Sequence, residues 1–225
     1  MMPSQPSTAV VTGGSSGIGF ALTQKLLSEG YHVFATSRSG DIPGITHPSL
    51  TVIPLDITDL SMVQAAAATI ADSRRKIDLL VNNAGAAPDV YELEPKPETF
   101  TQTFATNVTG LVFFTETLLP HLHQGAQIVM MSSAMGLIKN AGINGPAYRM
   151  SKAAVNMYAV MLAKRLSEKQ IRVTPMHPGW VKTKLGGMNA SLTPQESAAV
   201  IYAGILTNST TGQFWNTDIN GVETF

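Results

Sequence analysis

The sequence of 225 residues contains no cysteine, so disulfide bonds, metal thiolates and a cysteine nucleophile are excluded from its chemistry. Charged residues are scarce, at 13% of the chain, and their signs balance, with 15 basic and 15 acidic residues. A chain without net charge creates no long-range field that would favour nucleic acid or an anionic membrane as a partner. We therefore expect a small-molecule partner.

Long apolar runs are absent as well. Residues 1–7 contain neither a basic start nor an apolar stretch, and no later segment approaches the roughly 20 apolar residues of a membrane-spanning helix. We expect no signal peptide, no membrane association and a cytoplasmic location. Internal repeats and long linkers are also missing, which predicts one folded domain over residues 1–225.

Short β-rich runs alternate with helical patterns along the chain. This alternation is typical of a parallel sheet with helices on both faces, and right-handed crossovers make such a sheet doubly wound. The predicted fold class is therefore α/β, a Rossmann-type domain with seven parallel strands. The expected strands cover residues 9–12, 31–36, 50–55, 77–81, 127–131, 172–175 and 212–216, and the expected helices cover residues 18–28, 62–71, 100–119, 148–167 and 194–206.

A glycine-rich turn follows the first expected strand. Gly13 can turn tightly, Gly17 lets backbone approach a pyrophosphate, and Gly19 lets the next helix pack close to the sheet. Free amides at a helix start attract phosphate, so the turn predicts a dinucleotide site. A structural turn or a methyltransferase loop is the alternative. The residues expected to contact the cofactor here are Gly13, Ser15, Ser16, Gly17, Ile18 and Gly19.

The end of the second expected strand bears on cofactor choice. An NAD site usually places an acidic residue here to bind the ribose hydroxyls, whereas this chain has Ser37. The adjacent Arg38 can offer a forked hydrogen bond to a 2′-phosphate. We therefore expect a preference for NADP(H), with a solvated surface arginine as the alternative.

Tyr148 and Lys152 are spaced so that a helix places a phenol and an ammonium on one face. Reducing a ketone with hydride creates alkoxide character, which calls for a proton donor, and Tyr148 is the candidate. Lowering a phenol pKa from about 10 toward 7 requires roughly 4 kcal/mol. One cation about 4 Å away supplies approximately that at an effective dielectric of about 20, although desolvation opposes it.

In this order, the glycine turn, Asn107, Ser133, Tyr148 and Lys152 resemble the short-chain dehydrogenase/reductase superfamily, specifically its compact carbonyl-reductase-like members. The resemblance runs from Thr8 to about Trp215. It implies that Tyr148 is the acid or base, Ser133 polarises the carbonyl, Lys152 binds the nicotinamide ribose, and Asn107 supports a water-linked proton path. The segment between Ser133 and Tyr148 is longer than is common in the family, and Ser132 is the alternative catalytic serine.

The same resemblance implies further cofactor contacts. Asp56 would contact adenine, with a helix N-terminal acid as the alternative, and Asn83 would hold the cofactor strand. The segment after the sixth expected strand would meet the nicotinamide amide through the Val181 backbone and the Thr183 hydroxyl, or would simply be a turn. The residues expected at these contacts are Asp56, Ile57, Asn83, Ala84, Gly85, Tyr148, Lys152, Pro178, Gly179, Val181 and Thr183.

Other patterns have structural interpretations. His121 and His123 have a spacing that suits a metal only if further ligands converge, and none is evident, so we expect helix C-terminal histidines and no metal site. Methionines recur at helical spacing at Met150, Met157 and Met161, which predicts core or subunit-contact residues. Segments 137–146 and 182–193 are long enough to shape a substrate pocket.

Together these features predict an NADP(H)-dependent oxidoreductase that transfers hydride between the cofactor and a ketone, aldehyde or secondary alcohol. A 3-oxoacyl or steroid reductase is the alternative within the family. A non-catalytic nucleotide-sensing protein is the alternative from another class. The resemblance implies a homo-oligomer, a dimer or tetramer, with a monomer as the alternative.

Overall fold

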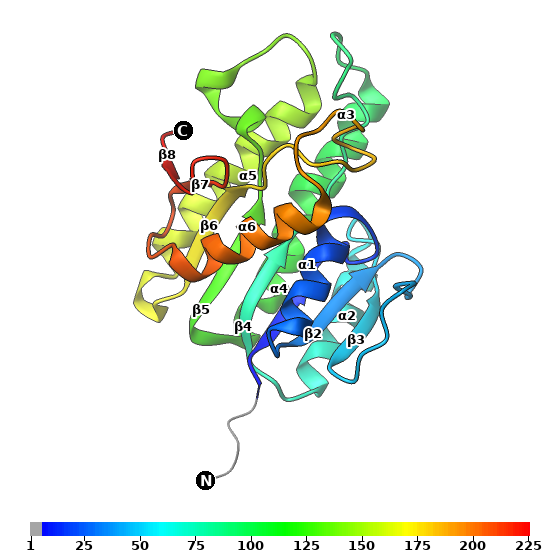
Figure 1. Ribbon diagram of the computed structural model, residues 1–225, viewed down its shortest axis with the longest axis vertical. Coiled ribbons are helices and arrows are strands. Elements are labelled where there is room, and N and C mark those ends of the chain that lie inside the picture. Colours follow the sequence, from blue (N-terminus) through cyan, green and yellow to red (C-terminus); the bar gives the residue numbers. More distant parts are fainter. Residues whose placement is uncertain (1–5) are drawn as a thin grey trace.

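The computed structural model describes residues 6–225, in which eight strands form one sheet in the order β3-β2-β1-β4-β5-β6-β7-β8. The strands β1 to β7 pair in parallel, and the chain winds outward in both directions from the neighbours β1 and β4 (Figure 1). This confirms the doubly wound α/β prediction. The strands are β1 (Thr8–Val11), β2 (His32–Ser37), β3 (Leu50–Pro54), β4 (Ile77–Asn82), β5 (Leu122–Met131), β6 (Arg172–His177), β7 (Phe214–Asn216) and β8 (Gly221–Glu223).

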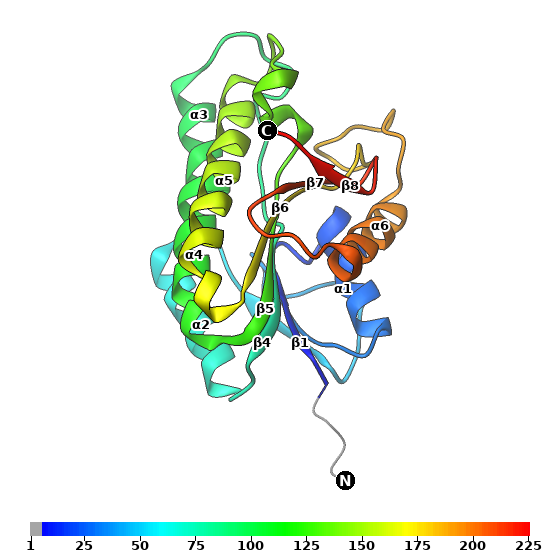
Figure 2. The ribbon, with the colours of Figure 1, turned by 90° about the vertical axis from the view of Figure 1, so that its left-hand side faces the viewer.

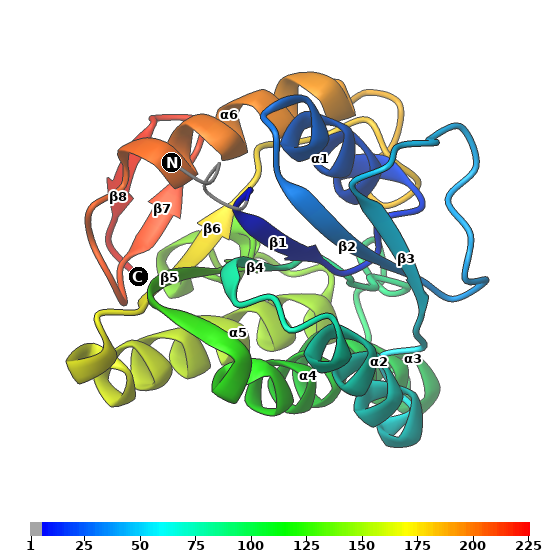
Figure 3. The same ribbon diagram turned by 90° about the horizontal axis from the view of Figure 1, so that it is seen from below.

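Helices cover both faces of the sheet, as Figures 2 and 3 show. The helices α1 (Gly17–Ser28) and α6 (Pro194–Thr207) pack on one face. The other face carries α2 (Leu60–Asp72), α3 (Pro97–Phe104), α4 (Leu111–Leu118) and α5 (Pro146–Arg165).

The core therefore has two layers, and β1 shows why. Its side chains alternate, so that Val10 joins the cluster under α4 and α5, while Ala9 and Val11 join the cluster under α1 and α6. All three are fully buried. A strand covered on both faces needs apolar residues at every position, which explains the continuous apolar run.

The structure corrects the predicted elements in three places. An eighth strand, β8, pairs antiparallel with β7, so the sheet is not seven-stranded and wholly parallel. The strand β5 begins at Leu122, because a register shift against β4 lets the chain from Leu122 to Gln127 bulge. The expected helix 100–119 is interrupted by a π-helical segment, η1 (Ala105–Gly110), between α3 and α4.

The carboxyl ends of the parallel strands all lie at the end of the sheet opposite the start of β1, where the long loops gather (Figure 1). Ligands of open α/β sheets bind at this edge, near the point where the winding direction changes. Within residues 6–225, no helix combines the length and the apolar character needed to cross a bilayer.

Gly110 marks a place where two elements approach too closely for a side chain. A Cβ at this position would collide with the carbonyl oxygen of Ile57, in the connection after β3. We expect Gly110→Ala to lower the free energy of unfolding by about 1–3 kcal/mol, as overpacking does, measured by urea denaturation. Gly221→Ala, where a Cβ would lie 3.6 Å from its nearest neighbour, is the matched control. Equal losses in the two variants would contradict the packing argument.

Candidate active site

The first turns of α5 place Tyr148 and Lys152 in the interior, at 7% and 5% exposure. The ammonium Nζ of Lys152 donates a 2.7 Å hydrogen bond to the carbonyl oxygen of Met131, the last residue of β5. The same nitrogen lies 5.6 Å from the centroid of the Tyr148 ring. The helix face predicted from the spacing therefore brings a buried cation against a buried phenol.

Burial shifts both groups away from their charged forms. It lowers the pKa of Lys152 from 10.5 to about 8, because water no longer solvates the ammonium. Burial also raises the pKa of Tyr148 above its usual 10, while a hydrogen bond with the Ser133 side chain acts in the opposite direction. In the protein alone, desolvation is the larger effect on the phenol, which is the opposition expected from the sequence. The direction of the shift favours the protonated phenol at neutral pH.

Two adjacent serines end β5, and their side chains have different partners. Ser133 precedes the short helix η3 (Ala134–Gly136), where its Oγ accepts from the Met135 amide at 3.1 Å, and its side chain lies near enough to Tyr148 to act on the phenol pKa. Ser132 is buried behind it and donates to Asn156 Oδ1 at 2.6 Å. The serine that acts on the phenol pKa is therefore Ser133, whereas the Ser132 hydroxyl is hydrogen-bonded to Asn156.

The longer segment between Ser133 and Tyr148 is held by α5 itself. The guanidinium of Arg149 donates from Nε to Asn144 O at 2.7 Å and from Nη1 to Asn140 O at 2.9 Å. These bonds gather the additional residues into a bulge over the start of the helix. The extra length therefore does not separate Ser133 from Tyr148.

Asn107 lies in η1 and is fully buried. Its Oδ1 accepts from the Ala86 amide at 2.7 Å, and its Nδ2 donates to Ala86 O at 2.8 Å and to Ser151 Oγ at 3.0 Å. Both amide protons are thus used to join the loop after β4 to α5. A Cβ at Gly85, in that loop, would lie 3.7 Å from Lys152 Nζ, so Asn107 lies in the immediate surroundings of the lysine.

The glycine turn has the features that a pyrophosphate requires. Ser16 precedes α1 but its side chain makes no capping hydrogen bond, which leaves the first amides of the helix for another acceptor. Gly13 and Gly17 have φ of 69° and 54°, a region that favours glycine. The sequence pattern suggested that Gly19 lets the helix pack close to the sheet. In the structure a Cβ on Gly19 would collide with the Gly13 carbonyl oxygen, so the turn itself requires glycine here. Ser15 and Ser16 are exposed, and Gly17 and Ile18 are half-buried.

The loop after β4 is tied directly to this turn. Asn83 donates from its backbone to Thr12 Oγ1 at 2.9 Å and from Nδ2 to Thr12 O at 2.8 Å. The amide of Ala84 also donates to Thr12 Oγ1, at 2.9 Å. Asn83 therefore lies beside the glycine turn.

The segment after β6 reaches the same turn. A Cβ on Gly17 would lie 3.1 Å from the Thr183 Cγ2, so these positions, more than 160 residues apart in the chain, are neighbours. The Thr183 hydroxyl donates to Val181 O at 3.3 Å and accepts from Gly186 N at 3.0 Å. Gly179 has φ of 83°, and the carbonyl of Pro178 accepts from Ser197 Oγ of α6 at 2.8 Å. The two halves of the expected cofactor site therefore meet.

Arg38, just after β2, is exposed, while Ser37 is buried and donates to Asp41 O at 2.8 Å. Hydrogen bonds from the Thr58 side chain and backbone lower the pKa of Asp56, and the Arg38 cation acts in the same direction. The N-cap of α2 is Asp59, so the alternative view of Asp56 as a helix N-terminal acid is wrong. The side chain of Ile57 is buried in the core, which leaves only its backbone for a ligand.

Asp89 is a residue of this site that the sequence patterns did not indicate. It is 1% exposed, and its Oδ2 accepts from the Ala147 amide at 2.6 Å and from the Tyr148 amide at 3.4 Å. The residue that precedes α5 is Gly145, which has no side chain to cap the helix. Asp89 caps it from 58 positions earlier in the chain, a separation at which no local signal exists.

The remaining patterns lie away from this site or are corrected. His121 ends a short 3-10 turn and His123 lies in β5, so they are not both helix C-terminal residues. Among residues 6–225, no group of three or more His, Cys, Asp or Glu side chains is arranged to hold a metal. Met150, Met157 and Met161 are 54%, 63% and 61% exposed, so they do not belong to the core.

Comparisons with known proteins support the fold described above. The family model described as short chain dehydrogenase matches residues 7–196. A "Probable NADP-dependent dehydrogenase" of Haemophilus influenzae is 36% identical over 183 residues, which cover 77% of this chain and 71% of that protein. The crystal structure of NADPH bound carbonyl reductase from chicken fatty liver is similar with a TM-score of 0.88 and 29% identity, covering 99% of this chain and 100% of that one. Carbonyl reductase Sniffer of D. melanogaster is similar with a TM-score of 0.90 and 26% identity, covering 98% and 100%.

The cap supplied by Asp89 can be tested without any assay of activity. We expect Asp89→Ala to lower the free energy of unfolding by about 1–2 kcal/mol, because the first amides of α5 lose their acceptor in a buried place. Asp89→Asn keeps an oxygen acceptor of the same shape and is the control, with a smaller loss. Urea denaturation measures both, and an equal loss in the two variants would show that the carboxylate acts through something other than the cap.

Proposed function

Because the chain belongs to the short-chain dehydrogenase family, we propose that it is an NADP(H)-dependent oxidoreductase that reduces ketones or aldehydes and runs reversibly with secondary alcohols. The observation that carries the proposal is the buried pair of Tyr148 and Lys152, whose ammonium lies 5.6 Å from the centroid of the phenol ring, with the buried Ser133 beside the phenol. Two carbonyl reductases share the fold over nearly the whole chain, and one of them contains NADPH. The entire chain would serve as a single cofactor-binding domain.

The residues at the sheet edge fit a dinucleotide with a 2′-phosphate. The uncapped start of α1 and the glycine turn offer backbone amides to the pyrophosphate. Arg38 is exposed just after β2, and its guanidinium suits a phosphate. The adjacent position, where an NAD site usually has an acidic residue, is Ser37. The 178–183 segment would hold the nicotinamide amide and Lys152 the adjoining ribose. The cofactor supplies the hydride, and the protein supplies binding, orientation and the proton.

Tyr148 and Ser133 would act on the carbonyl oxygen of the substrate. The two hydroxyl groups hydrogen-bond that oxygen as negative charge develops on it, and the phenol then gives up its proton. The raised pKa of Tyr148 keeps the phenol protonated before hydride arrives, which suits the reductive direction. The Lys152 cation stabilises the tyrosinate that remains. Asn107 would support the return of a proton by holding the loop beside the lysine.

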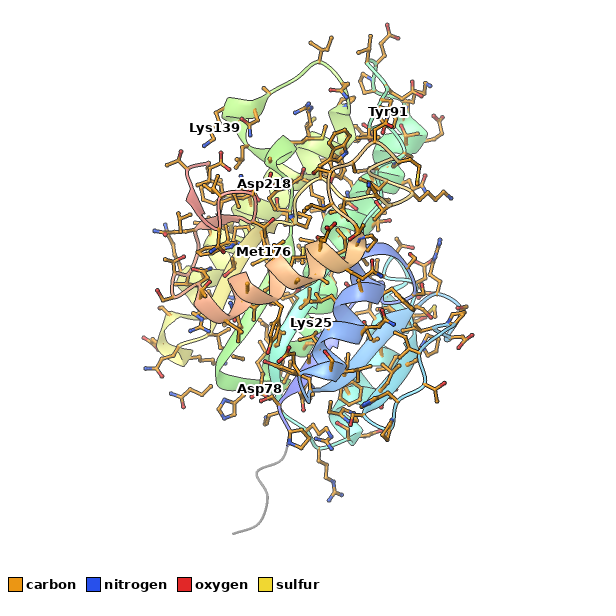
Figure 4. The ribbon with its side chains drawn as sticks, in the orientation of Figure 1. Lys25, Asp78, Tyr91, Lys139, Met176 and Asp218 are labelled. Atoms are coloured by element: carbon orange, nitrogen blue, oxygen red, sulfur yellow. The ribbon has the colours of Figure 1, made fainter. Side chains whose placement is uncertain are left out.

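Three loops border this edge and carry exposed apolar side chains. Tyr91, Ile138, Ile143 and Met188 are between 76% and 85% exposed. Tyr91 comes from the loop after β4, near Gly187 of the 182–193 segment (Figure 4). Such residues favour a carbonyl compound with an apolar body over a charged one. A 3-oxoacyl or steroid reductase is the runner-up within this proposal.

Exposed apolar side chains also lie on α4 and α5, away from the chemistry. Phe113 is 49% exposed, and Met157 and Met161 of α5 exceed 60%. Large exposed apolar side chains of this kind are often found at protein contacts. We expect a homo-oligomer, a dimer or tetramer, that uses these helices.

The reductase is tested by following NADPH and NADH oxidation against a panel of ketones and aldehydes. We expect turnover with NADPH, and a loss of about 10²–10⁴-fold in Tyr148→Phe, because the proton donor is removed. Binding of NADPH, measured by fluorescence, should survive in the variant. Saturable binding without turnover on a broad panel would favour a nucleotide sensor, and absent binding would overturn the cofactor assignment.

Cofactor preference depends on the residues after β2. Each hydrogen bond to a charged group contributes about 1.5–3 kcal/mol, so we expect Ser37→Asp with Arg38→Ala to lower the NADPH over NADH preference by about 10–100-fold. The ratio of the two kcat/KM values measures the change. Lys164→Ala with Lys169→Ala removes two exposed cations at and after the end of α5, the same change in net charge, and is the control. An unchanged ratio in the double variant would refute the role of Arg38.

A further inference from the structure

His177, the last residue of β6, is a half-buried titratable group that the chemistry above does not use. Its side chain is 12% exposed. Its Nδ1 accepts from the Ala134 amide at 3.3 Å, and its Nε2 lies 3.3 Å from Asp218 Oδ2. The imidazole is therefore hydrogen-bonded to Ala134, the residue that follows Ser133.

Ala134, the residue after Ser133, is held at both of its backbone polar atoms. The amide of Ala134 donates to His177, and the carbonyl of Ala134 accepts from Asn140 Nδ2 at 3.0 Å. Ser133 Oγ in turn accepts from the next amide, that of Met135. A movement of the Ala134 peptide would therefore carry the Ser133 hydroxyl away from Tyr148.

The contact with Ala134 determines the protonation state that His177 must have. A backbone amide only donates, so Nδ1 must carry a lone pair, and the ring proton must be on Nε2, facing Asp218. A doubly protonated ring has no acceptor to offer. The hydrogen bond to Ala134 therefore exists only with the neutral imidazole.

The charged groups around the ring come from two other elements and a loop. Asp218 follows β7, and its amide donates to Asn216 Oδ1 at 2.9 Å. Asn216 donates from Nδ2 to Glu223 of β8 at 2.8 Å, and Glu223 pairs with Lys139 of the 137–146 loop at 2.9 Å. Figure 4 shows Asp218 and Lys139 on the same side of the molecule. The carboxylate that faces the ring is thus placed by the last strand of the sheet.

Burial of the ring lowers the pKa of His177 below its usual 6.5, while Asp218, and then Glu223, act in the opposite direction. The net direction favours the neutral ring at neutral pH, which is the form that the Ala134 contact requires. Protonation at lower pH would remove the acceptor and place two N–H donors between Ala134 and Asp218.

We propose that His177 is a positioning residue for Ser133: its neutral ring, oriented by Asp218, holds the Ala134 amide and thereby the serine hydroxyl, and protonation of the ring releases them. This inference rests on the proposed reductase function. The sign follows from the protonation states. The kcat/KM for carbonyl reduction has its full value above the pKa of His177 and falls as the pH decreases through that pKa.

The pH profile of kcat/KM tests this with a conservative variant. The Oδ1 of asparagine can take the place of Nδ1 but does not titrate, so His177→Asn should keep activity within about threefold at neutral pH and lose the acid limb. His177→Leu should lose about 10–100-fold in kcat/KM for the carbonyl at all pH values, with NADPH binding retained. Asp218→Asn should move the acid limb to lower pH, because a carboxylate that favours the imidazolium is removed. His123→Asn, at an exposed position of β5, should change nothing.

A second measurement does not depend on activity. In protein with isotope-labelled histidine, two-dimensional NMR should show His177 as the Nε2–H form at neutral pH, with a titration midpoint below 6.5. The Nδ1–H form, or a charged ring at neutral pH, would overturn the proposal even if the protein is an active reductase. An acid limb that persists unchanged in His177→Asn would do the same. If the NMR result holds and no carbonyl is reduced, the reductase assignment fails while the hydrogen bond stands, and the positioning role fails with the reductase.

Discussion

The burial of the Lys152 ammonium is the constraint on which the rest of the site depends. A cation without water must have an acceptor, and the carbonyl of Met131 at the end of β5 provides it. That contact requires α5 to cross closely over the sheet edge. Gly136 makes the approach feasible, since a Cβ there would lie 2.6 Å from the Lys152 Cβ. The position of the helix, and with it of Tyr148, follows from the need to satisfy one charge.

Three side chains that are distant in sequence from the reacting groups bind the backbone or helix beside those groups. Asp89 accepts from the amides at the start of α5, Asn107 joins the loop after β4 to α5, and His177 accepts from the amide after Ser133. Buried hydrogen bonds of this kind cost little when complete and much when broken. The loops that border the substrate region are thereby tied to the same helix that carries the phenol and the ammonium. Such ties fix the geometry in advance of the reaction, which is how positioning lowers a barrier.

Desolvation also determines the electrostatic state of the pair. In water a lysine beside a tyrosine would favour tyrosinate, yet here burial raises the pKa of Tyr148 and lowers that of Lys152 to about 8. Both shifts reduce charge in a region without solvent. The charge that develops during hydride transfer would then be met by groups that are already placed and have no water to displace.

Local patterns in the sequence determined the elements and their chemistry, because the periods of strands and helices and the conformational freedom of glycine act over a few residues. The alternating strands and helices, the turn from Gly13 to Gly19, and the shared helix face of Tyr148 and Lys152 all follow from such short-range rules. Only the tertiary structure decided which of Ser132 and Ser133 meets the phenol, which acid caps α5, the direction of the Tyr148 pKa shift, and the pairing of β8 with β7. Those outcomes depend on contacts between distant segments and on the exclusion of water. The residues that flank a position along the chain determine neither of these.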